Sequence, residues 1–78
     1  MFERVKKLLV ETLNIDESEI TLDAELEKDL GINSLDVYEL VVSCEEEFNI
    51  EIEDETARTF VTVNDVVKFL EAEAQNRA

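Results

Sequence analysis

The chain has 78 residues and a formal net charge of −14 at neutral pH, from 21 Asp and Glu against 7 Lys and Arg. This charge excludes nucleic acids and anionic membrane surfaces as partners, because their phosphates would repel it. No apolar run approaches the roughly 20 residues that span a bilayer, so we expect no stable membrane insertion. A hydrophobic content of 45% is enough for one core, and we expect residues 1–78 to form a single domain.

The composition favours helices and removes most routes to catalysis. With no Pro and one Gly, the sequence offers few tight turns, so repeated short strands are not expected. It has no His, so a nucleophile would lack an imidazole base and zinc would lack a Cys/His cluster. One Cys allows no internal disulfide, and the N-terminus lacks the apolar block of a signal peptide. We therefore expect a cytoplasmic, monomeric protein with no catalytic residue and no metal site.

The first predicted helix covers about residues 2–13. Its apolar side chains recur at helical spacing and define a single inward stripe: Phe2, Val5, Leu8, Leu9, Thr12 and Leu13.

A long connection follows, from about residue 14 to residue 32. A structureless loop of this length is unusual in a small domain, but regularly spaced apolar residues should hold it across the bundle: Ile15, Ile20, Leu22, Leu26 and Leu30. We expect one turn of helix near residues 24–28, with Asp23 as its cap.

The second predicted helix covers about residues 34–48. Its inward stripe matches the helical template closely: Val37, Leu40, Val41, Cys44 and Phe48. The position of Cys44 on this stripe indicates a small core side chain and not a reactive thiol.

A short helix is expected at about residues 54–59, capped by Asp54 and held to the core by Ile50, Ile52, Ala57 and Phe60. The alternation of residues 50–53 also fits a brief strand, but no second strand is available to pair with it. The last helix covers about residues 63–74, starts at a capping box of Thr62 and Asp65, and points Val63, Val66, Val67, Leu70 and Ala74 inward. The predicted fold is an all-α four-helix bundle with three main helices, one short third helix and a long first loop.

One junction could carry chemistry, the segment from Asp29 to Asp36. Gly31 can adopt a positive φ, Asn33 is a good helix N-cap, and Asp36 suits the first turn. Ser34 then lies where free amides and the positive end of the helix dipole would stabilise an attached phosphate by roughly 0.3–1 kcal/mol. The alternative is that Asn33 or Ser34 only caps the helix.

A second apolar row, Leu35, Tyr38 and Val42, lies opposite the core stripe of the second helix and is surrounded by acidic residues. Such a strip suits a transient protein interface, although Tyr38 and Val42 could instead pack under the long connection. Ten acidic residues and no basic residue lie between Asp29 and Glu55. This concentration favours basic protein surfaces as partners over a role in solubility alone.

These residues resemble the acyl carrier protein family. The resemblance rests on the block from Asp29 to Asp36, continues through Glu39-Leu40-Val41 and residues 45–48, and covers nearly the whole chain. In that family an Asp-Ser-Leu motif carries the attachment serine. Here Ser34 and Leu35 match, while Asn33 stands where aspartate is usual and keeps the helix cap with one charge fewer.

The resemblance implies a non-catalytic, free-standing carrier. A phosphopantetheinyl transferase would attach phosphopantetheine to Ser34, and the thiol of this arm would carry acyl thioesters to enzymes of fatty-acid or related acyl synthesis. The family's recognition helix would dock on basic patches of these enzymes through Leu35, Asp36, Tyr38, Glu39, Val42, Glu45 and Glu46. By analogy, a bound acyl chain would lie between the second and third helices, against Val37, Leu40, Val41, Ala57 and Phe60.

Two other functions remain open at this point. One is a carrier of aminoacyl or peptidyl cargo, which the high acidity disfavours. The other is an acidic structural adaptor without an arm, which Asn33 favours.

Overall fold

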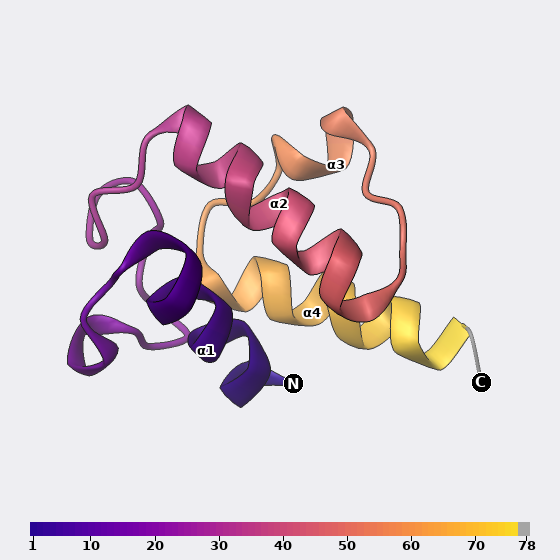
Figure 1. The fold of residues 1–78 in the computed structure, drawn as a ribbon, viewed down its shortest axis with the longest axis horizontal. Coiled ribbons are helices and arrows are strands. Elements are labelled where there is room, and N and C mark those ends of the chain that lie inside the picture. The colour runs from indigo at the N-terminus through magenta and orange to yellow at the C-terminus, as the bar shows by residue number, and fades with distance from the viewer. Residues whose placement is uncertain (77–78) are drawn as a thin grey trace.

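The computed structural model describes residues 1–76 and contains four α-helices, α1 (Phe2–Leu13), α2 (Ser34–Phe48), α3 (Asp54–Ala57) and α4 (Val63–Asn76). A short 3₁₀ turn, η1 (Glu17–Glu19), lies between α1 and α2. Helix α1 packs against α2 and α4, and α3 packs against α2 (Figure 1). Within the described residues there are no strands, so the predicted all-α bundle is confirmed and the strand alternative for residues 50–53 is wrong.

Helices α1 and α2 begin and end where the apolar pattern predicts. Each is followed by an asparagine in the left-handed conformation, Asn14 with φ 58° and Asn49 with φ 54°. Asparagine tolerates this region because its short polar side chain can form local hydrogen bonds. Both helices therefore stop for a local reason.

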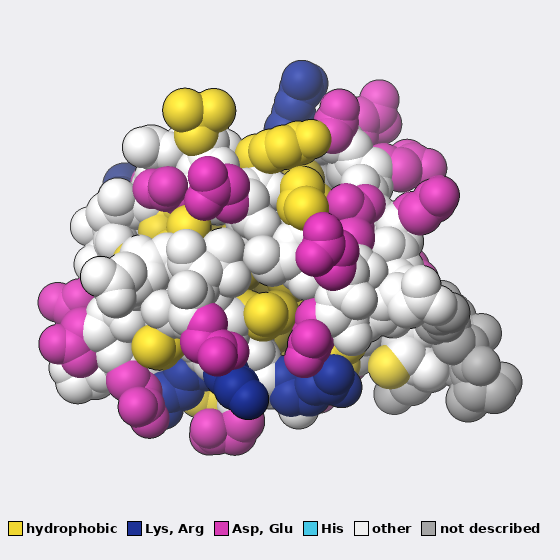
Figure 2. All heavy atoms as spheres, viewed as in Figure 1, with side chains coloured by type: hydrophobic (Ala, Val, Ile, Leu, Met, Phe, Trp, Pro, Cys, Tyr) yellow, Lys and Arg dark blue, Asp and Glu magenta, His cyan; other side chains and the backbone are white. Residues whose placement is uncertain are grey.

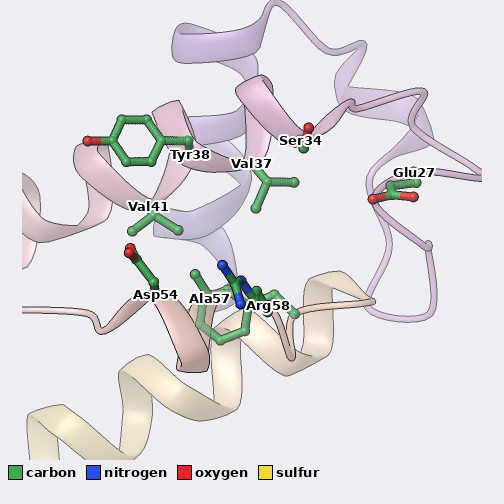
Figure 3. Close-up of a pocket in the computed structure, with 9 residues that line it drawn as sticks. Glu27, Ser34, Val37, Tyr38, Val41, Asp54, Ala57 and Arg58 are labelled. Atoms are coloured by element: carbon green, nitrogen blue, oxygen red, sulfur yellow. The ribbon is translucent and has the colours of Figure 1, made fainter.

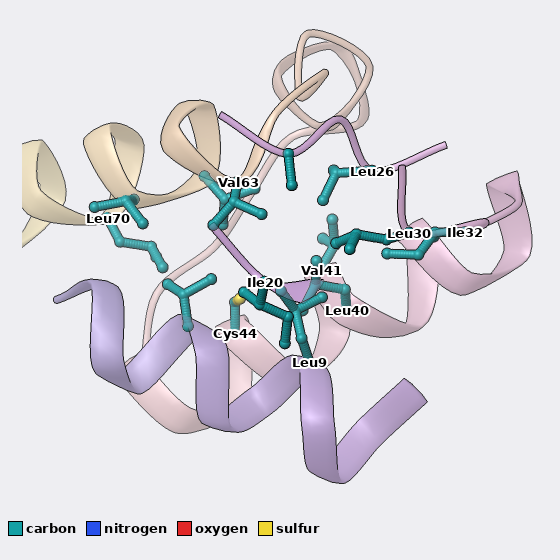
Figure 4. Packing of buried hydrophobic residues seen from close by; sticks show 14 of the residues in the cluster. Leu9, Ile20, Leu26, Leu30, Ile32, Leu40, Val41, Cys44, Val63 and Leu70 are labelled. Carbon is teal, nitrogen blue, oxygen red and sulfur yellow. The ribbon is translucent and has the colours of Figure 1, made fainter. Parts of the chain in front are cut away.

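The core draws side chains from all three long helices and from the connection (Figure 4). Leu9, Leu40, Val63 and Leu70 are among the fully buried residues. The predicted inward stripe of α4 is confirmed except at Ala74, which is exposed.

The connection between α1 and α2 is anchored as expected, but by a partly different set of residues. Ile20, Leu26 and Leu30 are buried, Ile15 is half-buried, and Leu22 is 42% exposed. Two residues that we did not predict, Ala24 and Ile32, are buried as well.

The one assigned helical turn of the connection is η1, and no helix is assigned to residues 24–28. Asp16 caps η1 by accepting a hydrogen bond from the Ser18 amide at 2.9 Å, and this bond and the Ser18 hydroxyl lower the pKa of Asp16.

The expected turn is nevertheless present one residue later, because the Asp29 amide donates to the Glu25 carbonyl at 2.9 Å. At the turn that begins at Glu25, the Glu25 amide donates to the Asp29 carboxylate at 2.7 Å and not to Asp23, so the predicted cap Asp23 is wrong. Glu25, the first residue of this turn, also forms an isolated antiparallel bridge with Thr62. The local turn is therefore held to the segment that precedes α4.

The short helix α3 has Glu53 as its N-cap residue, without a side-chain cap bond, so Asp54 is its first residue and not its cap. It ends at Ala57, two residues earlier than predicted, and the Thr59 hydroxyl donates to the Thr56 carbonyl at 2.6 Å. Ile52 is buried, while Ile50, Ala57 and Phe60 pack against the core as expected. The rings of Phe60 and Phe69 of α4 form a T-shaped pair, with ring centroids 5.7 Å apart.

Candidate functional site

Ser34 is the first residue of α2, and its side chain is exposed. Before it, Asn33 is extended, and its side chain accepts a hydrogen bond from the Asp36 amide at 2.9 Å. The Asp36 carboxylate accepts in return from the Asn33 amide at 3.3 Å. This predicted capping box satisfies two backbone amides without using the Ser34 hydroxyl, so the alternative in which Ser34 is the cap is wrong.

The backbone that leads to Ser34 is held in place by a tight turn. The Asp29 carboxylate accepts from the Glu25 amide at 2.7 Å, and the Ile32 amide donates to the Leu26 carbonyl at 2.9 Å. Gly31 has φ 67°, a conformation that glycine adopts readily and most residues with a side chain rarely adopt. Because Leu30 and Ile32 are buried on either side of this glycine, the start of α2 is fixed relative to the core.

A cleft of about 400 Å³ lies between α2 and α3, and Ser34 is among the residues that line it (Figure 3). Four of the five residues expected to contact an acyl chain line this cleft, namely Val37, Val41, Ala57 and Phe60. The fifth, Leu40, is 1% exposed and belongs to the core beneath the cleft, so its predicted role as a lining residue is wrong.

Polar and aromatic residues that the sequence did not suggest complete the lining: Glu27, Tyr38, Asp54 and Arg58. One feature of the sequence could have indicated Arg58: it is the one basic residue from Asp29 to Val67. Tyr38 was expected on the partner face, and it lies between this cleft and a shallow groove that Thr12, Val42 and Ser43 also line.

The outward apolar row of α2 is confirmed as a surface feature. Leu35 is 75% exposed and Tyr38 is 62% exposed, which rules out the alternative that Tyr38 packs under the connection. Val42 is half-buried. Helix α2 therefore presents two large apolar side chains next to Ser34.

The acidic residues around this row differ in what they contact. Glu39 and Glu46 are exposed, while Asp36 and Glu45 are half-buried. Glu45 accepts a hydrogen bond from the Ile52 amide at 2.8 Å and so ties the end of α2 to the segment before α3. Asp36 and Glu45 thus have structural contacts in addition to the surface role expected of them.

Charge is divided unevenly over the surface. Figure 2 shows Lys and Arg side chains gathered along the lower edge, over α1, and acidic side chains over the end of α2 and over α3. On α1, Arg4 lies 3.7 Å from Glu47 and Lys6 lies 3.4 Å from Glu17. Because Glu47 belongs to α2, Arg4 offsets one carboxylate of this helix. Other carboxylates of α2 and α3 are exposed and available to a partner: Glu39, Glu46, Asp54 and Glu55.

The comparisons with known proteins agree with this geometry. A family model described as a phosphopantetheine attachment site matches residues 3–70. Two curated proteins named acyl carrier protein, from Helicobacter acinonychis (strain Sheeba) and Helicobacter pylori (strain J99 / ATCC 700824), are each 51% identical to this chain over 71 residues. The aligned region covers 91% of this chain and 91% of each relative. The chain belongs to the acyl carrier protein family.

Members of the acyl carrier protein family are carriers and not catalysts, and their prosthetic group is covalently attached phosphopantetheine. The residues present fit such a group. An exposed serine at the first turn of a 15-residue helix lines a cleft that four apolar side chains also line. The outward amides of that turn suit a phosphate, and the apolar lining suits a hydrocarbon chain.

Cys44, the one cysteine of the sequence, lies in the core. Cys44 is 1% exposed, and burial, with a smaller contribution from the nearby Glu45 charge, raises the pKa of its thiol to about 12. It is therefore a core side chain, as predicted, and stays protonated at neutral pH. Residues 1–76 contain no group of three His, Cys, Asp or Glu side chains placed to hold a metal ion, and no helix among them could cross a membrane.

Proposed function

We propose that Ser34 is the attachment residue and that residues 1–78 act as one acyl carrier domain. The observation that carries this proposal is the exposed Ser34 hydroxyl beside the α2–α3 cleft, in a chain whose family carries phosphopantetheine. Of the three serines in the sequence, Ser43 is half-buried and bonded to Thr12, and Ser18 donates its hydroxyl to Asp16. Ser34 has the least obstructed hydroxyl of the three.

The attachment reaction would be catalysed by a separate phosphopantetheinyl transferase with Mg²⁺. The Ser34 oxygen attacks the phosphorus of coenzyme A that carries the pantetheine group and loses its proton to a base of the transferase. The bond from this phosphorus to the bridging oxygen of the pyrophosphate breaks, and adenosine bisphosphate leaves. Rigid anchoring by Leu30 and Ile32 keeps the nucleophile in a fixed position for this enzyme. Once attached, the arm supplies a terminal thiol that holds an acyl group as a thioester.

Partner enzymes would dock on the exposed face of α2. Leu35 and Tyr38 offer apolar contact next to Ser34, and the exposed carboxylates Glu39 and Glu46 complement basic patches. We keep Asp36, Val42 and Glu45 in this proposed face as half-buried members at its edge. Charge complementarity speeds association, while a small contact area allows the rapid release that a carrier needs.

The cargo would be an acyl chain from fatty-acid or related synthesis. Val37, Val41, Ala57 and Phe60 give the cleft an apolar lining in which the chain can be shielded from water. We also propose that the protein acts as a monomer and in the cytoplasm, because its acidic surface opposes self-association and suits encounters with several separate enzymes.

The test is incubation with coenzyme A, Mg²⁺ and a promiscuous phosphopantetheinyl transferase, followed by intact-mass measurement. Wild type should gain the mass of one phosphopantetheine. Ser34→Ala should gain none, because it lacks the nucleophile, whereas the control Ser18→Ala should be modified like wild type. No gain with several transferases would overturn the proposal and favour an adaptor without an arm.

A further inference from the structure

A single cation shares the cleft with the proposed attachment residue. Among the residues that line the cleft, Arg58 is the one with a basic side chain, and it directly follows α3 in the sequence. Ser34 lines the same cleft from the start of α2. Figure 3 shows the nitrogen atoms of Arg58 pointing from α3 toward α2, into the space that separates the two helices.

The guanidinium of Arg58 is not used elsewhere in the described part of the protein. The ion pairs there join Arg4 to Glu47 and Lys6 to Glu17, and the cations that lie over aromatic rings are Arg4 and Lys6. Arg58 is exposed and takes part in neither kind of contact. A flexible cation that makes no such contact is available to a ligand in the cleft.

The acidic surroundings of Ser34 favour a cation beside any anion that is held in this cleft. Glu27 and Asp54 line it, and Asp36 lies two residues after Ser34. A phosphodiester on Ser34 would carry one negative charge into this acidic environment, where like charges repel. The planar guanidinium of an arginine can donate two parallel hydrogen bonds to phosphate oxygens, which no other side chain in this cleft can do.

We infer that Arg58 binds the phosphate of the arm carried by Ser34 and thereby directs the arm along the α2–α3 cleft. This inference rests on the proposed attachment at Ser34. Because the contact joins the start of α2 to the end of α3, loading the arm tethers α3 to α2. The loaded protein is then more resistant to heat than the unloaded protein by an amount that depends on Arg58.

The experiment compares the midpoints of thermal unfolding, Tm, of unloaded and loaded protein at low salt, with loading verified by intact mass. In wild type the gain in Tm on loading should exceed that of Arg58→Gln by about 2–4 °C, the effect of one exposed ion pair in a domain of this size. Arg58→Lys should retain part of the gain, because it keeps the charge but not the paired donors. The difference should shrink in 1 M NaCl, where the screening length is about 3 Å.

Lys28→Gln is the matched control, since Lys28 is an exposed cation six residues before Ser34 that does not line the cleft. It should leave the gain in Tm at the wild-type value. The ³¹P resonance of the loaded arm should also move in Arg58→Gln and not in Lys28→Gln.

Failure of this inference is distinguishable from failure of the proposed function. If wild type and Arg58→Gln both load but show the same gain in Tm, Arg58 does not bind the arm. If Lys28→Gln reduces the gain as much as Arg58→Gln does, general charge is responsible and the specific contact is rejected. If no protein gains mass at all, attachment at Ser34 fails and this inference fails with it.

Discussion

Helices α2 and α4 begin with the same local device and present opposite surfaces. Asn33 and Asp36 cap α2 reciprocally, and Thr62 and Asp65 cap α4 in the same way. The first residue inside α2 is the exposed Ser34. The first residue inside α4 is Val63, which is 0% exposed.

The difference comes from what lies against each helix start. The segment before α4 and its first turn are clamped by the long connection: the Leu26 amide donates to the Val61 carbonyl at 2.8 Å, and the Val63 amide donates to the Ala24 carbonyl at 3.0 Å. The capping turn of α2 points away from the bundle, with Leu30 and Ile32 anchoring only the chain that leads to it. A capping box therefore sets the residue at which a helix begins. Tertiary packing decides whether that first residue is buried in the core, as in α4, or exposed, as in α2.

The largest expected difference in stability comes from exchanging the residue types at the two helix starts, with serine at position 63 and valine at position 34. Val63→Ser should lower the free energy of unfolding by about 3 kcal/mol, because it removes buried apolar surface and buries a hydroxyl. Ser34→Val should change it by no more than about 0.5 kcal/mol, since the side chain is exposed. Urea unfolding followed by circular dichroism measures both, and equal effects would mean that the two starts are packed alike.

Replacing the acidic residue of each capping box should give a smaller difference in the free energy of unfolding. Asp65 accepts from the amides of Val61 at 2.9 Å and of Thr62 at 3.0 Å, whereas Asp36 accepts from one amide at 3.3 Å. We expect Asp65→Ala to cost about 1–2 kcal/mol and Asp36→Ala about 0.5 kcal/mol at pH 7.

The Asp65 effect should also depend on pH. Hydrogen bonds from the Thr62 and Val61 amides hold the pKa of Asp65 below its ordinary value of 3.8. Its contribution to stability is therefore complete above pH 3.8 and is lost as the pH falls through the lowered folded-state pKa. Urea unfolding of wild type and Asp65→Ala at pH 7 and near pH 2 measures the difference in their free energies of unfolding, which should become smaller near pH 2. A difference that stays constant would indicate that the charge of Asp65 does not contribute to stability.

The smallest expected change in the free energy of unfolding concerns Asn33, the N-cap residue of α2. Asn33→Asp should change the free energy of unfolding by less than about 0.5 kcal/mol, because asparagine and aspartate are equally good caps. The variant should still be loaded at Ser34 in the mass assay. Asn33→Ala should cost about 1 kcal/mol in urea unfolding, and a loss of that size in Asn33→Asp would show that the cap depends on the neutral amide.

Features set by neighbours in the chain were predictable from the sequence. The bounds of α1 and α2, both capping boxes, the positive φ of Gly31 and the burial of Cys44 all follow from spacing and from residue type within a few positions. The position of Ser34 at a helix start followed as well. These features are local because a cap acts over three residues and an apolar stripe repeats every turn.

Features set by distant segments were decided by the tertiary structure. The bridge between Glu25 and Thr62 joins the connection to the segment that precedes α4, and the packing of the bundle places Leu40 in the core and not in the cleft. Arg58 and Ser34 line one cleft although 24 positions separate them in the sequence. Residue type and spacing thus predict which residue starts α2 and that its surroundings are acidic. Only the packing of α3 against α2 decided which cation stands across the cleft from it, because such contacts depend on how the chain folds back on itself.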